Sequence, residues 1–117
     1  MMERTRIGID IAKNLFHLVA MDSHGQLLWR KALPRRRLLE RLAQLESAQV
    51  GVEACATAHY WAREIQKLGH EVKLIHPRFV TPYRKSGKND FNDAEAIGEA
   101  MSRANMRFTT HGTQELI

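Results

Sequence analysis

The stretch RTRIGIDIAKNLFHLVAMDSHGQLLWRKAL, residues 4–33, decides the fold because it predicts three short strands in succession. Its runs RTRIGIDI, LFHLVAMD and QLLWRKAL are rich in apolar side chains, many of them β-branched or aromatic, as is typical of strands. Between the second and third runs stands the turn signal SHG, in which Gly25 can adopt a positive φ. The stretch therefore predicts an antiparallel meander.

Helix and strand patterns alternate after this meander. RRRLLERLAQLE carries leucines at helical spacing with arginines on the other face, which predicts a helix. AQVGVEA predicts a short buried strand, AHYWAREIQKLG an amphipathic helix closed by Gly69, and HEVKLIHP a strand ended by Pro77. The basic connection PRFVTPYRKSGK leads to a last helix of about Asp90 to Arg107, and the polar tail TTHGTQELI follows.

The predicted order of elements is βββαβαβα, in one α/β domain over residues 1–108 with a polar tail over 109–117. Each strand-helix-strand unit forms a parallel, right-handed crossover, so the helices cover both faces of a mixed sheet. This order is that of the ribonuclease H-like folds.

Composition narrows the class of protein. The chain has 117 residues, and no uninterrupted apolar run approaches the roughly 20 residues that cross a bilayer. The basic start MMERTRIGIDIAK is not followed by a signal-peptide core, so we expect a cytoplasmic protein. The single cysteine excludes an intrachain disulfide, and the histidines lack the spacing of a structural zinc site. The net charge of +5 favours a polyanionic partner such as nucleic acid.

Two acidic residues stand where predicted strands end. Asp10 follows the apolar residues Ile7 and Ile9, and Glu53 closes the run VGVE. If these two strands are parallel neighbours, both carboxylates emerge at the carboxyl edge of the sheet, where α/β proteins place their sites. A carboxylate in such an apolar run is costly to bury unless it is neutralised, and a divalent cation neutralises it.

The last predicted helix adds two more acids, Asp90 and Asp93, which lie on one helical face because they are three residues apart. Four carboxylates suit two Mg²⁺ or Mn²⁺ ions about 4 Å apart, as in phosphodiester chemistry. The alternative is a capping box, with Asp90 as N-cap and Asp93 at the third helical position. Asp10 would then be a turn residue and Glu53 a helix cap. The convergence of four acids on one architecture favours the metal site.

Basic residues precede the second acidic pair, with no acid among them. They suit phosphate contacts, and an aromatic residue beside them suits stacking on a base or sugar. The alternative is a solvated loop. The predicted nucleic-acid contacts, with a lysine that follows Asp10, are Lys13, Arg78, Tyr83, Arg84, Lys85 and Lys88.

The segment Arg35–Arg37 and the pair Tyr60 and Trp61 are interpreted more simply. Three arginines at a helix start oppose the favourable sense of the helix dipole, which is consistent with a bound polyanion, but an exposed face is the favoured reading. Tyr60 and Trp61 are expected to pack their helix onto the sheet, and Thr57 to cap it.

The motifs GIDIAK, GVEACATAHYWAREI and KNDFNDAEAIGEA resemble the three acidic motifs of the DEDD-type, RuvC-like transposases of the insertion-sequence one-hundred-ten family, which are bridge-RNA-guided recombinases. The similarity runs through nearly the whole chain. It implies a RuvC-like N-terminal catalytic domain that acts in DNA recombination with a guide RNA in the full-length protein. The metal-binding catalytic carboxylates then map onto Asp10, Glu53, Asp90 and Asp93.

In that family a C-terminal domain carries a serine nucleophile, and the serines of this chain do not match its motif. The resemblance therefore implies that this polypeptide lacks that domain and that complete strand exchange requires it. Three alternatives stay open: a RuvC-like Holliday-junction resolvase acting as a dimer, a non-catalytic nucleic-acid-binding module, and a sugar kinase or actin-like ATPase. The last is disfavoured because AKN, rather than glycine and hydroxyl residues, follows Asp10.

Overall fold

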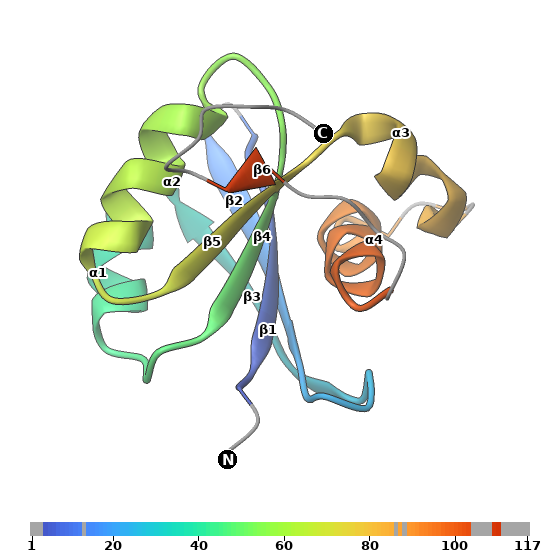
Figure 1. Ribbon diagram of the computed structural model, residues 1–117, viewed down its shortest axis with the longest axis horizontal. Coiled ribbons are helices and arrows are strands. Elements are labelled where there is room, and N and C mark those ends of the chain that lie inside the picture. The colour runs from blue at the N-terminus through green and yellow to red at the C-terminus, as the bar shows by residue number, and fades with distance from the viewer. Residues whose placement is uncertain (1–3, 13, 86, 88, 104–108, 111–117) are drawn as a thin grey trace.

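A computed structural model describes residues 4–12, 14–85, 87, 89–103 and 109–110. In this part of the chain one mixed sheet has the strand order β3-β2-β1-β4-β5-β6. Figure 1 shows α1 and α2 on one face of the sheet, and α3 and α4 on the other. The strands are β1 (Arg6–Asp10), β2 (Leu15–Met21), β3 (Leu27–Pro34), β4 (Gln49–Glu53), β5 (Glu71–Ile75) and β6 (Thr109–Thr110). The helices are α1 (Leu38–Ala43), α2 (Ala58–Lys67), α3 (Pro77–Val80) and α4 (Asn92–Met101).

The predicted meander is present. β2 pairs antiparallel with both β1 and β3, and Gly25 in the turn between β2 and β3 has a φ of 83°. β1 pairs parallel with β4, and β4 pairs parallel with β5. The crossovers through α1 and α2 therefore give the mixed sheet that the alternating pattern predicts.

The last helix differs from the prediction at both ends. α4 covers Asn92–Met101 rather than about Asp90 to Arg107, and its N-cap is Phe91. The side-chain oxygen of Asn89 accepts a hydrogen bond from the backbone N–H of Phe91 at 2.8 Å, which forms a turn ahead of the helix. Asp90 lies in this turn, so the alternative in which Asp90 is the N-cap of this helix is wrong.

Two other segments depart from the predicted pattern. The basic connection contains α3 and a 3-10 helix over Thr81–Tyr83, because Pro77 suits the first position of a helix and His76 Nδ1 accepts the backbone N–H of Arg78 at 3.1 Å. The predicted tail begins with β6, which pairs antiparallel with β5. This pairing adds a strand beyond the predicted order.

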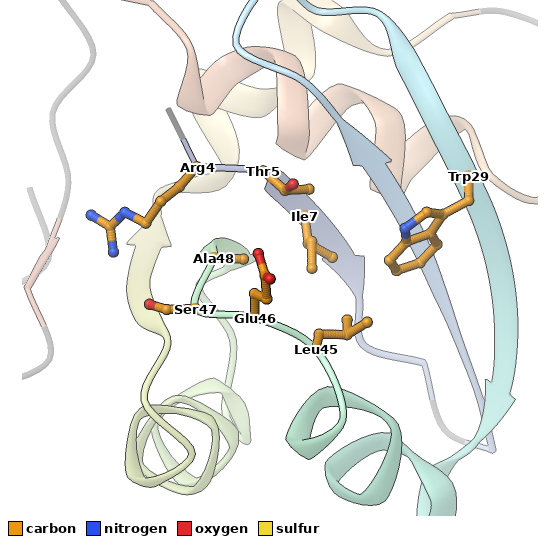
Figure 2. A pocket seen from close by; sticks show the side chains of 8 residues that line it. All are labelled: Arg4, Thr5, Ile7, Trp29, Leu45, Glu46, Ser47 and Ala48. Atoms are coloured by element: carbon orange, nitrogen blue, oxygen red, sulfur yellow. The ribbon is translucent and has the colours of Figure 1, made fainter. Parts of the chain in front are cut away.

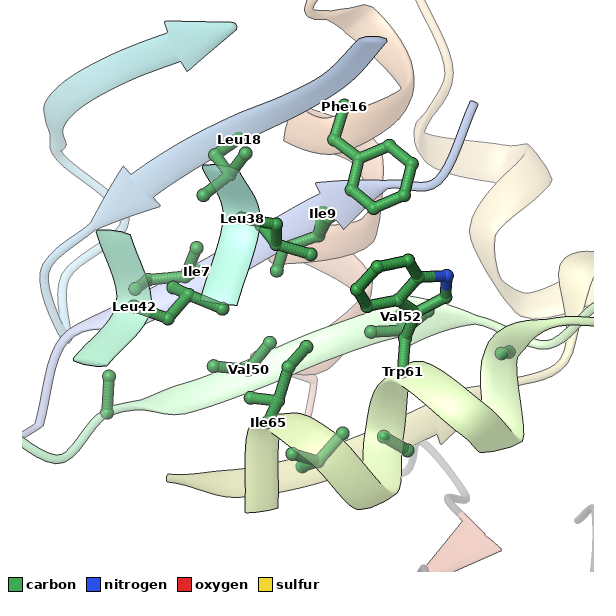
Figure 3. Close-up of a cluster of buried hydrophobic side chains, with 14 of the residues drawn as sticks. Ile7, Ile9, Phe16, Leu18, Leu38, Leu42, Val50, Val52, Trp61 and Ile65 are labelled. Atoms are coloured by element: carbon green, nitrogen blue, oxygen red, sulfur yellow. The ribbon is translucent and has the colours of Figure 1, made fainter. Parts of the chain in front are cut away.

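The main hydrophobic core lies between the sheet and the helices α1 and α2. Alternate residues of β1 and β4 enter it, since successive strand side chains point to opposite faces. Figure 3 shows them against the helices, with Ile7, Ile9, Val50 and Val52 facing Leu38, Leu42, Trp61 and Ile65. The predicted packing of Trp61 is confirmed. The same prediction for Tyr60 is wrong, because 48% of Tyr60 is exposed.

The opposite face of β1 and β4 carries glycines, and α4 lies close against them. A Cβ on Gly8 would stand 2.1 Å from the carbonyl oxygen of Ala94, and a Cβ on Gly51 would stand 2.8 Å from Met101 Sδ. Small side chains on α4, at Ala94 and Gly98, complete this approach. The glycines therefore set how near the first turn of α4 comes to the end of β1.

His70 is a buried polar residue that joins three elements. Its Nδ1 accepts the backbone N–H of Ala48 at 3.1 Å, and its Nε2 donates to the carbonyl oxygen of Leu42 at 2.7 Å. We expect His70→Leu to lower the free energy of unfolding by about 2 kcal/mol, because the buried N–H of Ala48 loses its partner and the carbonyl oxygen of Leu42 keeps the N–H of Leu45 but loses the imidazole. Urea denaturation followed by circular dichroism measures this. The exposed His24 is the control. If His24→Leu lowers the free energy of unfolding as much as His70→Leu does, the hydrogen bonds of His70 are not the cause of the loss.

None of the helices in the described part of the chain is long and apolar enough to cross a membrane.

Candidate metal centre

The ends of β1 and β4 bring two predicted site residues together. The parallel register pairs Ile9 with Val52, so Asp10 and Glu53, the next residues, end their strands side by side at the carboxyl edge. Because Ile9 and Val52 enter the main core, Asp10 and Glu53 point to the opposite face, where α4 lies. Both acids are half-buried. This part of the predicted juxtaposition is therefore present.

A third acid joins them from the first turn of α4. Arg84 Nε donates to Asp93 Oδ1 at 2.9 Å, and Arg84 Nη2 donates to Glu53 Oε2 at 2.5 Å. One guanidinium thus bridges a strand end and a helix start. These charge-assisted bonds hold Glu53 and Asp93 near each other.

The pKa of Asp10 is raised by its burial and by the negative charge around it. Burial raises the pKa of its carboxyl, and the nearby carboxylates of Asp93 and Glu53 raise it further. His17 and Arg84 act in the opposite sense but do not cancel the rise in pKa. Asp10, Glu53 and Asp93 are therefore one electrostatically coupled group.

The fourth predicted acid, Asp90, is exposed but borders the same site. It lines a hollow of about 450 Å³ together with Asp10 and Asp93. The amide residues Asn89 and Asn92 line it as well, and sequence reasoning missed them. Their position in the motif KNDFND, beside the two aspartates, was the available signal.

His17 is a third residue that sequence reasoning missed. It pairs with Asp10 across the antiparallel β1–β2 ladder and lines the hollow. Its ring packs edge-on against Phe91 with 5.1 Å between ring centroids. The meander signal predicts that some residue of β2 lies opposite Asp10, but only the register identifies which one.

The chemistry of these side chains fits a hard divalent cation. Carboxylate and amide oxygens are the ligands that Mg²⁺ and Mn²⁺ prefer. In the described residues, however, no three Asp, Glu, His or Cys side chains are arranged closely enough to hold an ion. The guanidinium of Arg84 supplies positive charge between Glu53 and Asp93 instead. The four-carboxylate metal site remains a prediction.

Four of the predicted nucleic-acid contacts lie in the described part of the chain, and two of these pair with acids. Arg84 engages the acids, and Lys85 forms an ion pair with Glu95. The guanidinium of Arg78 lies 4.9 Å from the ring centroid of Phe79, on the exposed surface. Tyr83 is half-buried against the packing of α3 and α4.

The guanidinium of Arg103 makes a cation–π contact with the ring of Tyr83, with 5.1 Å between the guanidinium carbon and the ring centroid. Lys13 and Lys88 lie outside the described residues. Within the segment that the sequence predicts as a loop, a 3-10 helix over Thr81–Tyr83 precedes Arg84, which pairs with Glu53 and Asp93.

A separate hollow of about 410 Å³ lies at the opposite end of the strands from the acidic site (Figure 2). Ile7, Trp29 and Leu45 line its apolar part, and Arg4 stands beside it. Thr5 and Ala48, which precede β1 and β4, place it at the amino ends of these strands. It is therefore not part of the acidic site.

Comparison with known proteins decides the family. Residues 7–117 match the family model DEDD_Tnp_IS110, described as "Transposase". The chain belongs to this transposase family. The predicted resemblance is thereby confirmed, whereas the guide RNA stays a prediction.

Named relatives of this transposase-family chain are bacterial. The Yersinia enterocolitica "Transposase for insertion sequence element IS1328" is 51% identical over 111 residues, which are 95% of this chain and 33% of the relative. The Pseudomonas aeruginosa "Probable family 20 transposase" is 48% identical over 107 residues, which are 92% of this chain and 32% of the relative. The chain thus spans about one third of these relatives.

Solved structures show the fold of this transposase-family chain. A Thermus thermophilus RuvC structure superposes with a TM-score of 0.62 and 12% identity, covering 90% of this chain and 99% of that one. T. thermophilus RuvC in complex with a Holliday junction substrate gives a TM-score of 0.59 and 15% identity, and the match covers 83% of this chain and 91% of that one. At these identities the likeness concerns the fold alone. The predicted RuvC-like α/β class is confirmed.

Proposed function

We propose that this chain is the metal-dependent catalytic domain of a DNA transposase, which acts on phosphodiester bonds during transposition of an insertion sequence. The observation that carries the proposal is the convergence of Asp10, Glu53 and Asp93 at the carboxyl edge of a RuvC-like sheet. Membership of a transposase family supports the same function.

Asp10, Glu53, Asp90 and Asp93 would hold the divalent ion, Mg²⁺ or Mn²⁺, when it is bound. Such an ion activates the attacking hydroxyl and stabilises charge on a phosphoryl oxygen. Partial burial of Asp10 on the face that carries α4 fixes one carboxylate, while Arg84 keeps Glu53 and Asp93 close together. Arg84 would have to release at least one of these carboxylates for them to hold the ion.

The substrate side of the proposal involves partners beyond the described residues. DNA would contact Arg78, Lys85 and Tyr83, with Lys13 and Lys88 as further phosphate contacts. The curated relatives are about three times as long as this chain, which supports a further domain that carries the serine nucleophile. We propose that the whole protein works in the cytoplasm as a homo-oligomer with a guide RNA.

The first test of this function is metal binding followed by DNA cleavage. Calorimetry with Mn²⁺ is expected to show saturable binding that is lost in both Asp10→Asn and Asp93→Asn, because distant acids share one ion. Cleavage of supercoiled and four-way-junction DNA by the chain, alone and joined to a relative's remaining domain, follows. Metal-independent DNA binding that Asp10→Asn leaves unchanged would instead support a non-catalytic binding module. Preferential cleavage of the junction would support a resolvase.

Arg84 provides a second test, because it competes with the ion for two carboxylates. Arg84→Gln is expected to tighten Mn²⁺ binding roughly tenfold, since a charge-assisted hydrogen bond contributes about 1.5 to 3 kcal/mol, reduced here by partial exposure. The same variant is expected to lower the melting temperature in EDTA. Arg78→Gln is the matched control, because Arg78 lies in the same segment between β5 and α4 but contacts the ring of Phe79 and no acid of the site. Weaker metal binding in Arg84→Gln alone contradicts the competition.

A further inference from the structure

A second hollow at the carboxyl edge of the sheet lies on the face that carries α1 and α2. It measures about 450 Å³ and is lined by Asn14, Pro34, Arg35, Arg36, Tyr60 and Trp61. Pro34 ends β3 opposite Leu15, two residues from His17, which pairs with Asp10. This hollow, here called the Tyr60 pocket, therefore shares an edge of the sheet with the acidic group but opens on the other face.

Trp61 contributes a buried donor to the wall of the Tyr60 pocket. The residue is only 6% exposed, and its indole Nε1 is buried without a hydrogen-bond partner in the described part of the protein. In Figure 3 this nitrogen lies on the side of the ring turned away from Ile7, Leu42 and Val50. An indole N–H can only donate, so the group fits a ligand that brings an acceptor oxygen.

Two arginines line the pocket beside this tryptophan. The guanidinium carbon of Arg35 lies 5.6 Å from the ring centroid of Trp61, and Arg36 is exposed beside it. Among the described residues Arg36 makes no ion pair, whereas Arg37 pairs with Glu40 at 3.9 Å. The pocket therefore suits an anion.

Tyr60 gives the pocket an exposed aromatic surface. Nearly half of the residue is exposed, and its ring contacts Trp61 in an edge-on arrangement with 5.0 Å between centroids. The rest of the ring is open to a planar ligand. The pocket therefore suits a ligand with a flat π-system next to an anion, and a nucleotide has both in its base and its phosphate.

We infer that the Tyr60 pocket binds one unpaired nucleotide of a nucleic-acid strand. The phosphate lies between Arg35 and Arg36, the base stacks on Tyr60, and the indole N–H of Trp61 donates to a phosphate or base oxygen. An acidic peptide would match the arginines but leave the exposed ring without a stacking partner. The inference extends the proposed function, because a strand held here runs along the edge that carries Asp10 and Glu53.

Binding is measured by fluorescence anisotropy with labelled thymidine and uridine hexamers in EDTA, so the result does not depend on metal binding or cleavage. Tyr60→Leu is expected to weaken binding about tenfold, in line with base stacking on aromatic side chains, whereas Tyr60→Phe is expected to bind as the parent chain does. Arg36→Gln is expected to reduce the slope of log K against log salt by about 0.7, the value for one phosphate contact on a single strand. Lys67→Gln removes the same charge at the far end of α2 and leaves the slope nearly unchanged.

Nuclear magnetic resonance separates this pocket from diffuse attraction to a basic protein. The two tryptophans give two indole N–H signals, assigned with Trp29→Phe. The Trp61 signal is expected to move downfield as the hexamer binds, while the Trp29 signal, from the opposite edge of the sheet, stays in place. A stationary Trp61 signal at saturation, or equal affinities for the parent chain and Tyr60→Leu, overturns the inference. So does inorganic phosphate that binds as tightly as the hexamers. A preference for thymidine or uridine hexamers supports it and identifies the strand as DNA or RNA.

Discussion

Gly8→Ala is expected to lower the free energy of unfolding by about 3 kcal/mol or more, the upper end of the cost of overpacking a core. The added Cβ would lie 2.1 Å from the carbonyl oxygen of Ala94 and 2.8 Å from the backbone nitrogen of Gly98. Both neighbours are backbone atoms of α4, so no side chain can move aside. The helix must shift away from β1, and Asp93 moves with it.

Gly51→Ala is the matched control on the neighbouring strand. There the added Cβ would lie 2.8 Å from Met101 Sδ and 3.1 Å from Ile97 Cγ2. The flexible Met101 side chain can rotate away, and the stiffer, β-branched Ile97 needs to shift by only a few tenths of an ångström. A loss of about 1 kcal/mol is expected for this variant. Urea denaturation measures the stability of both variants, and Mn²⁺ calorimetry tests whether Gly8→Ala also abolishes the proposed metal binding. Equal losses for the two variants contradict the close backbone approach of α4 to β1.

Asp10→Asn is expected to raise the stability of the metal-free chain at neutral pH while abolishing its stabilisation by Mn²⁺. Burial and the neighbouring carboxylates raise the pKa of Asp10 in the folded state. The folded state therefore binds a proton more readily than the unfolded state, and ionised Asp10 destabilises the fold above its folded pKa. This destabilisation disappears as the pH falls through the folded pKa to the unfolded one. The neutral amide removes it at every pH.

Bound metal reverses the sign of this effect. An ion that binds only the folded chain stabilises it by about 2.7 kcal/mol at a concentration of 100 times its Kd. We expect Mn²⁺ to raise the melting temperature of the parent chain and to leave that of Asp10→Asn unchanged. Thermal unfolding with EDTA and with Mn²⁺, between pH 4 and 8, measures both effects.

Asp22 supplies the control with the opposite sign. The backbone N–H groups of Gln26 and His24 donate to its carboxylate and lower its pKa. Its stabilising contribution is present above the unfolded pKa and lost as the pH falls through the folded one. Asp22→Asn is therefore expected to lower stability at neutral pH and to keep the response to Mn²⁺. A gain of stability in Asp22→Asn, or none in Asp10→Asn, contradicts this account of the charges.

The sequence predicted the elements and the strand ends well, because both depend on local patterns. Alternation of apolar residues around Ile7 and Ile9 identifies a half-buried strand, and Asp10 is the polar residue that ends it. The same reasoning places Glu53 at the end of β4, and parallel pairing of the two strands brings the acids together. Local patterns were less reliable at the start of α4, because the side chain of Asn89 accepts the backbone N–H of Phe91 and the helix begins at Asn92, two residues later than predicted.

By itself, then, the sequence determined the family through its three acidic motifs and the α/β class through its periodicity. Only the tertiary structure decided which charges meet. Arg84 stands 31 residues from Glu53 and 9 from Asp93, yet one guanidinium binds both. Tyr60 and Trp61 are adjacent in one helix, yet one is exposed and the other buried. Such outcomes depend on long-range packing, which a local pattern does not encode, because side chains from distant segments compete for the same space and charge.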